Sequence, residues 1–435
     1  MAIECDVLII GGGPAGCTAA ATLAARGRDV VLLEKERHPR FHIGESLLPL
    51  NTAIFDRLGI SDRVAAIGVH KPGAEFVSDA TGQAVQFSFA QGLDQRYTSS
   101  WQVPRAPFDE LLFRTARERG ARAREGVAVT SVAFGRAGER AQVAATGPEG
   151  EPETYRPRFV LDASGRETFL AGRLHKKEAD KRNTTAAVYA HYRGVERRTG
   201  ALDGYISVHL AEDGWFWLIP LPDDVMSVGF VGDQSVFKGR LGTPRDLLLQ
   251  RIAASPTVSA RMRGAEMISE VTSTGNYSYY CDAASGDGYL MIGDAFAFLD
   301  PVFSSGVLLA MTTGEMGAGV AEQWLADPAL GRKAAARMER EVRHAMGRLA
   351  WLVHRINQPA LRLLFMSPAN RLRMRDGLVS LLAGNLRARR DQMLPVLAFK
   401  SVYYIAAGLL RVGVLKAPAT GSSRSGAEPV LRAAA

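Results

Sequence analysis

The stretch Asp6-Val7-Leu8-Ile9-Ile10-Gly11-Gly12-Gly13-Pro14-Ala15-Gly16 decides the fold of this 435-residue chain. It is an apolar run that ends in a glycine-rich turn. An alanine-rich segment follows as far as Arg26, Gly27 stops it, and a second apolar run covers Asp29–Leu33. Strand, turn, helix and strand in this order form a βαβ unit with parallel strands. The sequence therefore predicts an α/β protein with a doubly wound, Rossmann-like domain.

The glycines of this turn have the spacing G-x-G-x-x-G, at Gly11, Gly13 and Gly16. Gly11 permits the tight turn, Gly13 lets the backbone approach a pyrophosphate, and Gly16 lets helix and strand pack closely. The helix N-terminus offers free N–H groups to the phosphates. Glu34, at the end of the second strand, is placed to accept hydrogen bonds from ribose hydroxyls. A dinucleotide site is therefore favoured over an unrelated glycine-rich turn.

Three later segments resemble motifs of the FAD-dependent monooxygenases and halogenases, a resemblance that covers roughly residues 3–330. The segments are Arg105-Ala106-Pro107-Phe108-Asp109, Asp162-Ala163-Ser164-Gly165 and Gly293-Asp294-Ala295. The resemblance implies that Arg105 lies near the flavin and that Asp294 hydrogen-bonds its ribityl chain, although helix N-capping is an alternative role for Asp294. The further FAD contacts expected from it are Pro14, Ala15, Lys35, Gly44, Glu45, Ser46, Asp162, Ala163, Gly306 and Val307.

The segment Gly214-Trp215-Phe216-Trp217-Leu218-Ile219-Pro220 narrows the resemblance to the flavin-dependent halogenases. Its Trp-x-Trp-x-Ile-Pro pattern is similar to a signature of that family, where it lies between flavin and substrate. Alternate residues of a strand point to the same face, so Trp215 and Trp217 are able to wall one side of a channel. Two aromatic rings that merely fill a core are the alternative.

A lysine of this sequence matches the halogenase pattern as well. Lys71, in Gly68-Val69-His70-Lys71-Pro72-Gly73, falls where the halogenases carry their catalytic lysine. The resemblance implies that an ammonium or amine at this position orients hypohalous acid toward the substrate, and burial is known to lower the pKa of lysine. A solvated surface lysine is the alternative that composition alone would favour.

The segment Phe298-Leu299-Asp300-Pro301-Val302-Phe303-Ser304-Ser305-Gly306 resembles the Phe-x-x-Pro-x-x-Ser-x-Gly stretch of halogenases. Backbone N–H groups of Ser305 and Gly306 at a helix start are expected to bind chloride or bromide, unless the serines only cap that helix. Pro301 and Phe303 are expected to line the channel with the tryptophans. Tryptophan halogenases carry a glutamate where this chain has Phe303, so we expect a phenolic or pyrrolic substrate.

Four regions are expected along the chain. The FAD-binding domain takes residues 1–175 and 285–330, because the strand Tyr289–Ile292 returns to the nucleotide fold. Runs such as Thr184–Tyr192 and Met226–Val231 predict an interleaved, sheet-rich substrate domain over residues 176–284. Residues 331–416 are expected to form a helical C-terminal region, and residues 417–435 a disordered tail.

The charge of the chain is unevenly distributed. Residues 332–435 contain 19 Lys/Arg and 5 Asp/Glu, a net charge of +14, so residues 1–331 carry −6 of the total of +8. A basic region is formed by Arg371, Arg373, Arg375, Arg387, Arg389 and Arg390. No reading motif accompanies it, so nucleic acid is not expected. A solvated face, an acidic carrier protein that presents the substrate, and an anionic membrane surface remain as interpretations.

The segment Leu394–Leu415 is apolar but is interrupted by Lys400 and Arg411, which makes a membrane span unconvincing. Its apolar residues recur at helical spacing, which predicts an amphipathic helix. We rank its roles as a core or lid helix first, a wall of the substrate tunnel second and a membrane-surface helix third.

These patterns together predict an FADH2-dependent halogenase of electron-rich aromatic rings, free or tethered to a carrier protein. No second G-x-G-x-x-G follows, so a separate flavin reductase is expected to supply FADH2. The alternatives are a single-component FAD hydroxylase, a reductase of isoprenoid chains, and a non-catalytic scaffold. No signal-peptide pattern is seen at Met1, and Cys5, Cys17 and Cys281 have neither metal nor disulfide spacing, so we expect a cytoplasmic protein without a metal site.

Overall fold

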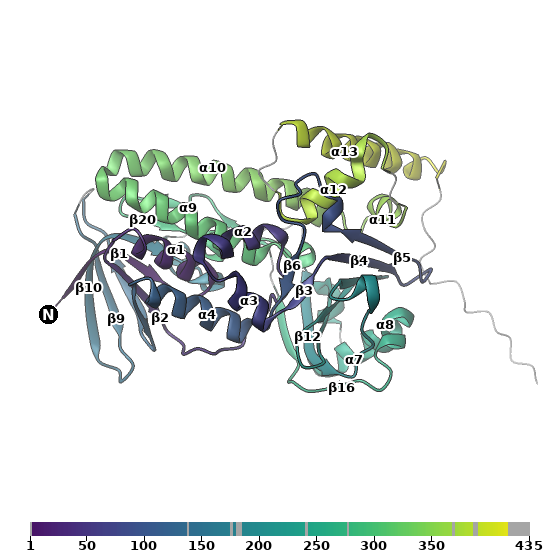
Figure 1. Ribbon diagram of the computed structural model, residues 1–435, viewed down its shortest axis with the longest axis horizontal. Coiled ribbons are helices and arrows are strands. Elements are labelled where there is room, and N and C mark those ends of the chain that lie inside the picture. The colour runs from purple at the N-terminus through teal and green to yellow at the C-terminus, as the bar shows by residue number, and fades with distance from the viewer. Residues whose placement is uncertain are drawn as a thin grey trace, which may run out of the picture.

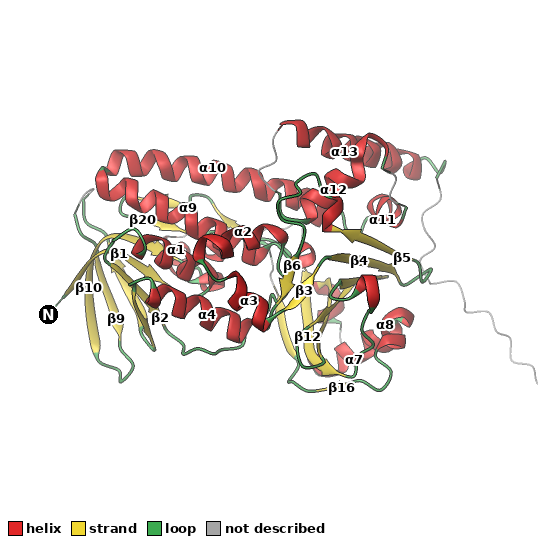
Figure 2. Cartoon of the chain, viewed as in Figure 1, coloured by secondary structure: helices red, strands yellow, loops and turns green. Residues whose placement is uncertain are grey.

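The computed structural model describes residues 2–136, 139–174, 177–179, 185–239, 242–275, 278–367, 370–385 and 390–415 (Figures 1 and 2). Side chains are not described for Pro301 and residues 390–393. The disordered tail expected over residues 417–435, together with Arg387 and Arg389, therefore lies outside the described residues.

A parallel sheet forms the centre of the first half of the molecule. Its strand order is β19-β20-β10-β1-β2-β7, and the pairs β1–β2, β1–β10, β10–β20 and β2–β7 are parallel. These strands are β1 (Ile3–Ile10), β2 (Val30–Glu34), β7 (Arg122–Glu125), β10 (Pro152–Asp162), β19 (Ser285–Gly286) and β20 (Tyr289–Met291). The antiparallel strands β8 (Ala128–Ala133) and β9 (Gln142–Thr146) extend β10. This arrangement confirms the predicted doubly wound α/β fold.

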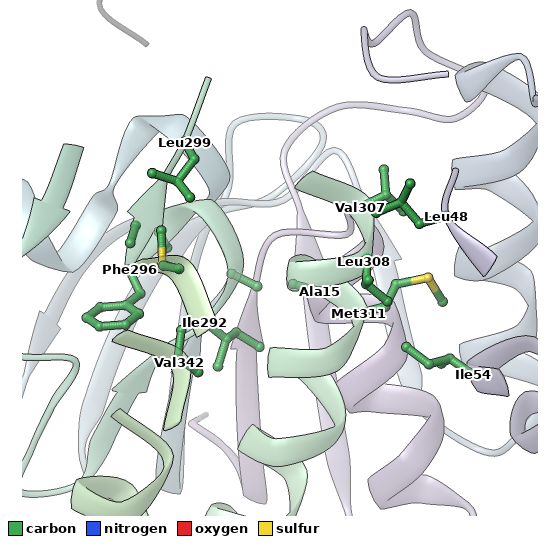
Figure 3. Close-up of a cluster of buried hydrophobic side chains, with 14 of the residues drawn as sticks. Ala15, Leu48, Ile54, Ile292, Phe296, Leu299, Val307, Leu308, Met311 and Val342 are labelled. Atoms are coloured by element: carbon green, nitrogen blue, oxygen red, sulfur yellow. The ribbon is translucent and has the colours of Figure 1, made fainter. Parts of the chain in front are cut away.

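Helices cover this sheet because its central strands β1 and β2 are apolar on both faces. Helix α1 (Pro14–Ala24) packs between α4 (Arg105–Glu118) and α9 (Gly306–Ala326), and α10 (Pro328–Val353) packs on α9 (Figure 1). Figure 3 shows Val307, Leu308 and Met311 of α9 projecting toward Leu48 and Ile54 at α2 (Pro49–Leu58). The start of α9 is thereby fixed in the core.

A second, mostly antiparallel sheet lies beside the first in Figure 2 and has the strand order β16-β12-β15-β14-β13-β4-β5. The strands are β4 (Gly73–Ser78), β5 (Ala84–Ser88), β12 (Thr185–Arg193), β13 (Ile206–Ala211), β14 (Gly214–Pro220), β15 (Val225–Asp233) and β16 (Glu266–Met267), with β17 (Thr272–Gly275) paired to β12. Strands β4 and β5 come from the range assigned by sequence to the FAD-binding domain. They join this sheet through the parallel pair β4–β13.

Shorter elements connect the two sheets and cover their outer faces. Strands β3 (Val69–Lys71) and β6 (Ser100–Gln102) form a two-stranded sheet of their own. Helices α7 (Pro244–Ala254) and α8 (Pro256–Arg261) bury Val188, Phe216 and Phe230 on the outer face of the second sheet. The remaining elements are α3 (Ser61–Ile67), η1 (Phe89–Gln91), η2 (Gly165–Glu167), α5 (Phe169–Leu174), β11 (Lys177–Ala179), η3 (Gly200–Leu202), α6 (Gln234–Lys238), β18 (Tyr279–Cys281), η4 (Gly293–Ala295), β21 (Ala297–Phe298) and η5 (Pro301–Phe303).

The C-terminal helices extend from the first sheet onto the second. After α10 come α11 (Pro359–Met366), η6 (Arg371–Arg373), α12 (Met374–Leu382) and α13 (Arg390–Arg411). Helix α11 contacts β4 and β5, α12 contacts η1, and α13 contacts α11 and α12. Figure 1 shows α13 as the outermost helix of this layer. This helical layer therefore covers the edge of the second sheet that is formed by β4 and β5.

Candidate functional site

A cavity of about 450 Å³ lies between the two sheets. One side is formed where β1, β2 and β10 end, at Ile10, Glu34 and Ala163. The opposite side is formed by β14, through Trp215 and Trp217. The carboxyl ends of parallel strands are where doubly wound folds bind nucleotides. The position of this cavity is therefore that of a dinucleotide site that also opens toward the second sheet.

The glycine turn between β1 and α1 forms one wall of the cavity. Gly11 has φ +102°, and a Cβ there would lie 2.4 Å from the carbonyl oxygen of Ala163. A Cβ on Gly16 would lie 2.0 Å from the carbonyl oxygen of Gly11, so this glycine faces the turn and not the cavity. A Cβ on Gly13 would meet no protein atom within 4 Å. The open space beside Gly13 fits a pyrophosphate against the first turn of α1.

Glu34 closes the second strand of the βαβ unit and is buried on the cavity wall. Its carboxylate accepts hydrogen bonds from the backbone N–H groups of Gly12, at 2.7 Å, and Glu36, at 2.9 Å. These bonds fix the carboxylate at the end of β2 while leaving acceptor capacity on both oxygens. The position is the one that a ribose-binding acidic residue requires.

Arg105 begins α4, and its guanidinium reaches the cavity. Two nitrogens donate to the buried carboxylate of Asp109, at 2.8 and 2.9 Å, and a third donates to the carbonyl oxygen of Ile43 at 2.7 Å. A Cβ on Gly44 would lie 3.0 Å from this guanidinium, and Gly44 has φ +108°. Arg105 therefore holds the segment around Gly44 against the cavity, whose edge also includes the half-exposed Lys35.

Asp162 does not take the position expected of a cofactor contact. It is fully buried at the end of β10, where its two oxygens accept from the N–H groups of Ser164, at 2.9 Å, and Leu170, at 2.7 Å. The carboxylate therefore holds the turn after β10, and the neighbouring Ala163 is the residue that lines the cavity. Asp162 does lie at a strand end, as the sequence predicts, but its carboxylate does not line the cavity, because two backbone N–H groups donate to it.

Asp294 lies in the short helix η4 and lines the cavity. Its side chain makes no N-cap hydrogen bond, because Ile292 occupies the cap position. Burial raises the pKa of Asp294 to about 6, while Arg166 and Arg105 act in the opposite direction. A carboxyl group in this state is suited to hydrogen-bond the hydroxyl groups of a bound sugar or polyol chain.

A histidine that the sequence did not single out holds one residue of this wall, Glu45. Nε2 of His191, on β12, lies 2.6 Å from Oε1 of Glu45. Burial lowers the pKa of His191, but the hydrogen bond to Glu45 outweighs burial and leaves that pKa raised. Glu45 lines the same cavity, and its Oε2 is buried without a protein partner among the described residues. A donor on a bound cofactor would satisfy this oxygen, which favours occupancy of the cavity.

Trp215 and Trp217 stand side by side on β14, as their alternation predicts. Their ring centroids are 6.0 Å apart, and both rings are buried on the cavity wall. Nε1 of Trp217 donates to Oγ of Ser227 at 3.1 Å. A Cβ on Gly229 would lie 2.2 Å from the Trp217 ring, so this glycine makes room for the indole. The pair forms a rigid aromatic wall opposite the nucleotide sheet.

Lys71 is among the most deeply buried polar residues, with 1% of its surface exposed. Its Nζ donates to Oγ of Ser46, at 2.8 Å, and to the carbonyl oxygen of Leu47, at 2.7 Å. Burial lowers the pKa of Lys71 to about 7. Ser46 lines the cavity, whereas Lys71 does not. The lysine is therefore buried and not a solvated surface residue, and one serine hydroxyl separates it from the cavity.

The start of α9 meets the cavity close to where a halide was expected. Ser304, which has φ +55°, and Gly306 and Val307 line the cavity, whereas Ser305 does not. Ser305 is the N-cap residue of α9, but its side chain makes no cap hydrogen bond. The first N–H groups of a helix have no partner within the helix and favour anions. The anion-binding end of α9 therefore points into the same cavity as the turn at Gly13.

Phe303 does not line the cavity in this structure. It is buried in η5, and its ring centroid lies 6.4 Å from that of Phe365 on α11. Phe365 also packs against Phe76 and Phe87 of the second sheet, with centroids 5.0 and 5.7 Å away. The expected channel residue is thus part of an aromatic cluster beneath the C-terminal helices. Pro301 begins η5, and its side chain is not described.

The cavity gathers most of the residues expected from the sequence. Those on its wall are Gly11, Gly13, Pro14, Ala15, Glu34, Lys35, Gly44, Glu45, Ser46, Arg105, Ala163, Trp215, Trp217, Asp294, Gly306 and Val307. Residues on the wall that the sequence analysis missed include Arg40, His42 and Arg166. Arg40 and His42 stand next to the Gly44-Glu45-Ser46 motif, and this proximity was the available signal. Within the described part of the chain, no group of His, Cys, Asp and Glu is arranged to hold a metal ion.

Comparison with known proteins adds independent information. Residues 4–314 match the family described as FAD binding domain. A tryptophan 2-halogenase of Chondromyces crocatus is 35% identical over 311 residues, which cover 70% of this chain and 58% of that protein. The chain therefore matches less than two thirds of that relative's length. A 1H-pyrrole-2-carbonyl-[peptidyl-carrier protein] brominase of Pseudoalteromonas luteoviolacea is 32% identical over 325 residues, which cover 73% of this chain and 77% of that protein.

Two solved structures have the same architecture over almost their whole length. A flavoprotein/dehydrogenase from Cytophaga hutchinsonii superposes with a TM-score of 0.85 at 28% identity, covering 93% of this chain and 99% of that one. The flavin-dependent brominase Bmp2 superposes with a TM-score of 0.81 at 26% identity, covering 93% and 100%. The C-terminal helices, beyond the matched family segment, thus also have counterparts in known folds.

Proposed function

This chain belongs to the flavin-dependent halogenases, and we propose that it converts halide ion to hypohalous acid and halogenates an electron-rich aromatic ring. Bound FADH2 would supply the two electrons that, with O₂, halide and one proton, give FAD, hypohalous acid and water. The ring then exchanges a hydrogen for the halogen, and a second water is released. The observation that carries this proposal is the buried Lys71 amine, held by Ser46 at the cavity wall.

The residues of the cavity fit FAD. Gly13 and the first turn of α1 would hold the pyrophosphate, Glu34 the adenosine ribose and Asp294 the ribityl chain. Arg105 would hold the Gly44–Ser46 segment against the flavin through its bond to Ile43. The unpartnered Oε2 of Glu45 would accept from the cofactor. Trp215 and Trp217 of the second sheet would then lie on the opposite side of the cavity, between the flavin and the substrate.

Halide would bind at the start of α9. Ser304, Gly306 and Val307 line the cavity there, and the N–H groups of the first helical turn favour a negative charge. Ser304 itself lines the cavity, so its side-chain hydroxyl would be available to the same ion. Binding halide close to the flavin would keep the two reactants of the first step together, whichever of chloride and bromide is used.

Lys71 would receive the oxidant after it leaves the flavin. A pKa of about 7 means that both the ammonium and the free amine are populated near neutral pH. The ammonium would hydrogen-bond hypohalous acid. The free amine would instead exchange an N–H hydrogen for the halogen to form a haloamine, with release of the second water as the O–halogen bond breaks, and would take up the ring hydrogen when the halogen is passed to the substrate. Ser46 accepts from Nζ and also lines the cavity, so it would orient Lys71 toward the arriving oxidant. Confinement behind Ser46 would keep this small oxidant from escaping.

The substrate would be a phenol or a pyrrole. The residue before Ser304 is Phe303, which has no carboxylate to assist substitution on a weakly activated ring. The aromatic ring of the substrate must therefore be electron-rich itself. A relative is named for acting on a pyrrole that is attached to a peptidyl carrier protein. A carrier-bound substrate is therefore included in the proposal.

Two features of the cellular setting belong to the proposal as well. A second G-x-G-x-x-G is absent from the sequence, so FADH2 would come from a separate flavin reductase. All three cysteines are free and buried, which is compatible with a reducing compartment. We place the enzyme in the cytoplasm, where reduced nicotinamide and flavin reductases are found.

The test combines the chain with a flavin reductase, FAD, NADH, bromide or chloride, and a panel of phenols and pyrroles, free and carrier-bound. We expect a product whose mass shows replacement of hydrogen by halogen. Lys71→Met, which keeps much of the side-chain volume, should lose more than about 100-fold of this activity and still retain FAD. The matched control is Lys238→Ala at an exposed lysine, which should halogenate normally. Halogenation by Lys71→Met at the normal rate would refute the role of Lys71, and O₂ consumption without any halogenated product would refute the function.

A further inference from the structure

The outward side of α13 carries an apolar strip that no described part of the chain covers. This strip, here called the outer face, consists of Leu394, Leu397, Tyr404 and Ile405 of α13 and of Val412 directly after the helix, which are 50–70% exposed. Isolated exposed leucines are common, but a row of large apolar side chains along one helix marks an interaction site. We propose that the outer face of α13 docks this protein on an anionic membrane surface.

The spacing of these residues places them on one side of α13. Leu394, Leu397, Ser401 and Ile405 are separated by three, four and four residues, so they lie on one side of the helix, with Ser401 as a polar member of the row. The opposite side, with Phe399, Tyr403 and Ala406, is buried against the body of the protein. A helix on the surface of a soluble domain normally has a polar outer side. In α13 the outer side is apolar as well as the inner side, which indicates that the outer side also contacts an apolar environment.

The helix is suited to lie on a bilayer and not to cross it. Among the described residues, Leu394–Arg411 is the one helical window long and apolar enough to cross a membrane, and only 22% of it is buried. Its inner side is held by α11 and α12, Pro395 lies near its start, and Lys400 and Arg411 interrupt it. A helix anchored in this way can insert its outer side into the interfacial region while the fold stays outside.

The charges beside the outer face favour an anionic surface over a neutral one. Residues 392–427 contain no Asp or Glu. Lys400 and Arg411, eleven residues apart, lie along one edge of the strip. Helix η6 contacts α13 and brings the exposed Arg371 together with Leu372, which at 78% is the most exposed large hydrophobic residue in the described part of the chain. Basic side chains that flank an apolar strip are the arrangement that binds anionic lipids.

An aromatic cluster at the same edge has the chemistry of a membrane interface. Nε1 of Trp351 donates to the hydroxyl of Tyr404 at 3.1 Å, and the Lys400 ammonium lies 4.9 Å from the centre of the Trp351 ring. Arg355 lies on the same indole at 4.9 Å. Tryptophan and tyrosine are enriched at the level of lipid headgroups, because their rings are apolar and their tips are polar. The cluster would therefore set the depth to which α13 inserts.

Two other occupants fit the outer face less well. The chain after Leu415 offers only Val430 and Leu431 as large aliphatic residues, too few to cover five exposed side chains. An acidic carrier protein would match the arginines, but interfaces of that kind need polar partners around the apolar core. The outer face has basic side chains along one edge only, whereas a fluid bilayer accepts an apolar strip of this kind.

The experiment uses the full-length protein and sedimentation with vesicles of phosphatidylcholine alone or with 30% phosphatidylglycerol. We expect about tenfold stronger partition into the anionic vesicles, and weaker binding as salt is raised. Leu397→Glu/Ile405→Glu should lower that partition about tenfold. The matched control, Leu249→Glu/Leu330→Glu, places the same charges at exposed leucines outside α13, which are 44% and 46% exposed, and should partition normally. Retained FAD and an unchanged melting temperature would show that each variant is folded.

Several outcomes would overturn the proposal. These are partition that is equal for neutral and anionic vesicles, partition that Leu397→Glu/Ile405→Glu leaves unchanged, and no partition into either vesicle. If light scattering shows dimers that Leu397→Glu/Ile405→Glu abolishes, a second copy of the chain covers the outer face instead. If an acidic carrier protein binds the wild type but not this variant, and vesicles do not bind, the carrier is the partner. None of these measurements depends on halogenase activity.

Discussion

Burial of Lys71 affects both the stability of the protein and the reactivity of this amine. Its amine is almost completely buried, and its two acceptors, Ser46 and the carbonyl oxygen of Leu47, carry no formal charge. Without a nearby counter-ion, burial disfavours the charged form and lowers the pKa of Lys71 to about 7. An ionisable residue whose charged form is disfavoured by burial in this way is a candidate functional residue on physical grounds alone.

The lowered pKa of Lys71 predicts how stability depends on pH. Between about pH 7 and 10.5 the unfolded chain holds a proton on this amine that the folded chain lacks, so folding becomes more favourable as pH rises. Lys71→Met removes this effect. The stability of Lys71→Met relative to wild type should therefore be highest at or below pH 7 and should fall by as much as about 4 kcal/mol by pH 10.

Urea unfolding of both proteins at several pH values between 6 and 10 provides the check. Other groups titrate equally in the two proteins and cancel in the difference. A difference in the free energy of unfolding that is independent of pH would show that Lys71 keeps an ordinary pKa. In that case the amine would be charged throughout the working range, and capture of the oxidant as a haloamine would be untenable.

At the scale of elements, the turn between β1 and α1 is where sequence and packing agree most closely. Gly16 is on α1 and faces the turn, where an added Cβ would lie 2.0 Å from the carbonyl oxygen of Gly11. Backbone atoms on both sides leave little room for adjustment. The turn can therefore keep its shape only with glycine at this position.

Gly16→Ala should consequently destabilise the protein by about 1–3 kcal/mol and abolish FAD binding, because the backbone must shift where the pyrophosphate would lie. The matched control is Gly319→Ala in α9, where an added Cβ meets no atom within 4 Å. That change should stabilise the helix by up to about 1 kcal/mol and leave FAD binding intact. Thermal unfolding and flavin fluorescence on titration measure both effects. Normal FAD affinity in Gly16→Ala would disprove the assigned role of the turn.

The elements that the sequence predicted well are those encoded locally. The βαβ unit, the helix from Arg105 and the strands near Thr184–Tyr192 and Met226–Val231 follow from composition and periodicity over ten to twenty residues. The joining of β4 and β5 to the second sheet depends on pairing between Ala74 and Ile206, which are far apart in the chain. No local pattern in either strand indicates that partner.

The same distinction separates the parts of the candidate site. Motif residues such as Gly13 and Trp217 lie on the cavity wall because the local turn or strand that contains them determines which way they face. Asp162, Phe303 and Lys71 were also identified, but their side chains do not line the cavity, because partners elsewhere in the chain hold them. These partners are Leu170, Phe365 and Ser46. The Glu45–His191 pair joins two segments and was missed for the same reason.

At the scale of the whole molecule, the cavity connects the two sheets. Its wall contains β1, β2 and β10 on one side and β14 on the other, while α9 closes the end between them. In the protein alone, the Glu45–His191 bond is one of the polar contacts that cross this boundary. A bound FAD would add contacts to both sides at once. Binding should then stabilise the molecule as a unit and not only its nucleotide-binding half.

Hydrogen exchange with and without FAD tests this expectation. At a free FAD concentration of 100 times Kd, the folded state gains about 2.7 kcal/mol, and exchange through global unfolding slows accordingly everywhere. Local opening near the cavity should slow further in both the Gly11–Gly16 turn and the strand Gly214–Pro220. Helix α7, on the outer face of the second sheet, should show the global effect alone. If Gly214–Pro220 behaves like α7, then FAD does not reach the tryptophan wall. The oxidant would in that case have to pass from flavin to Lys71 without the separation that Trp215 and Trp217 are proposed to provide.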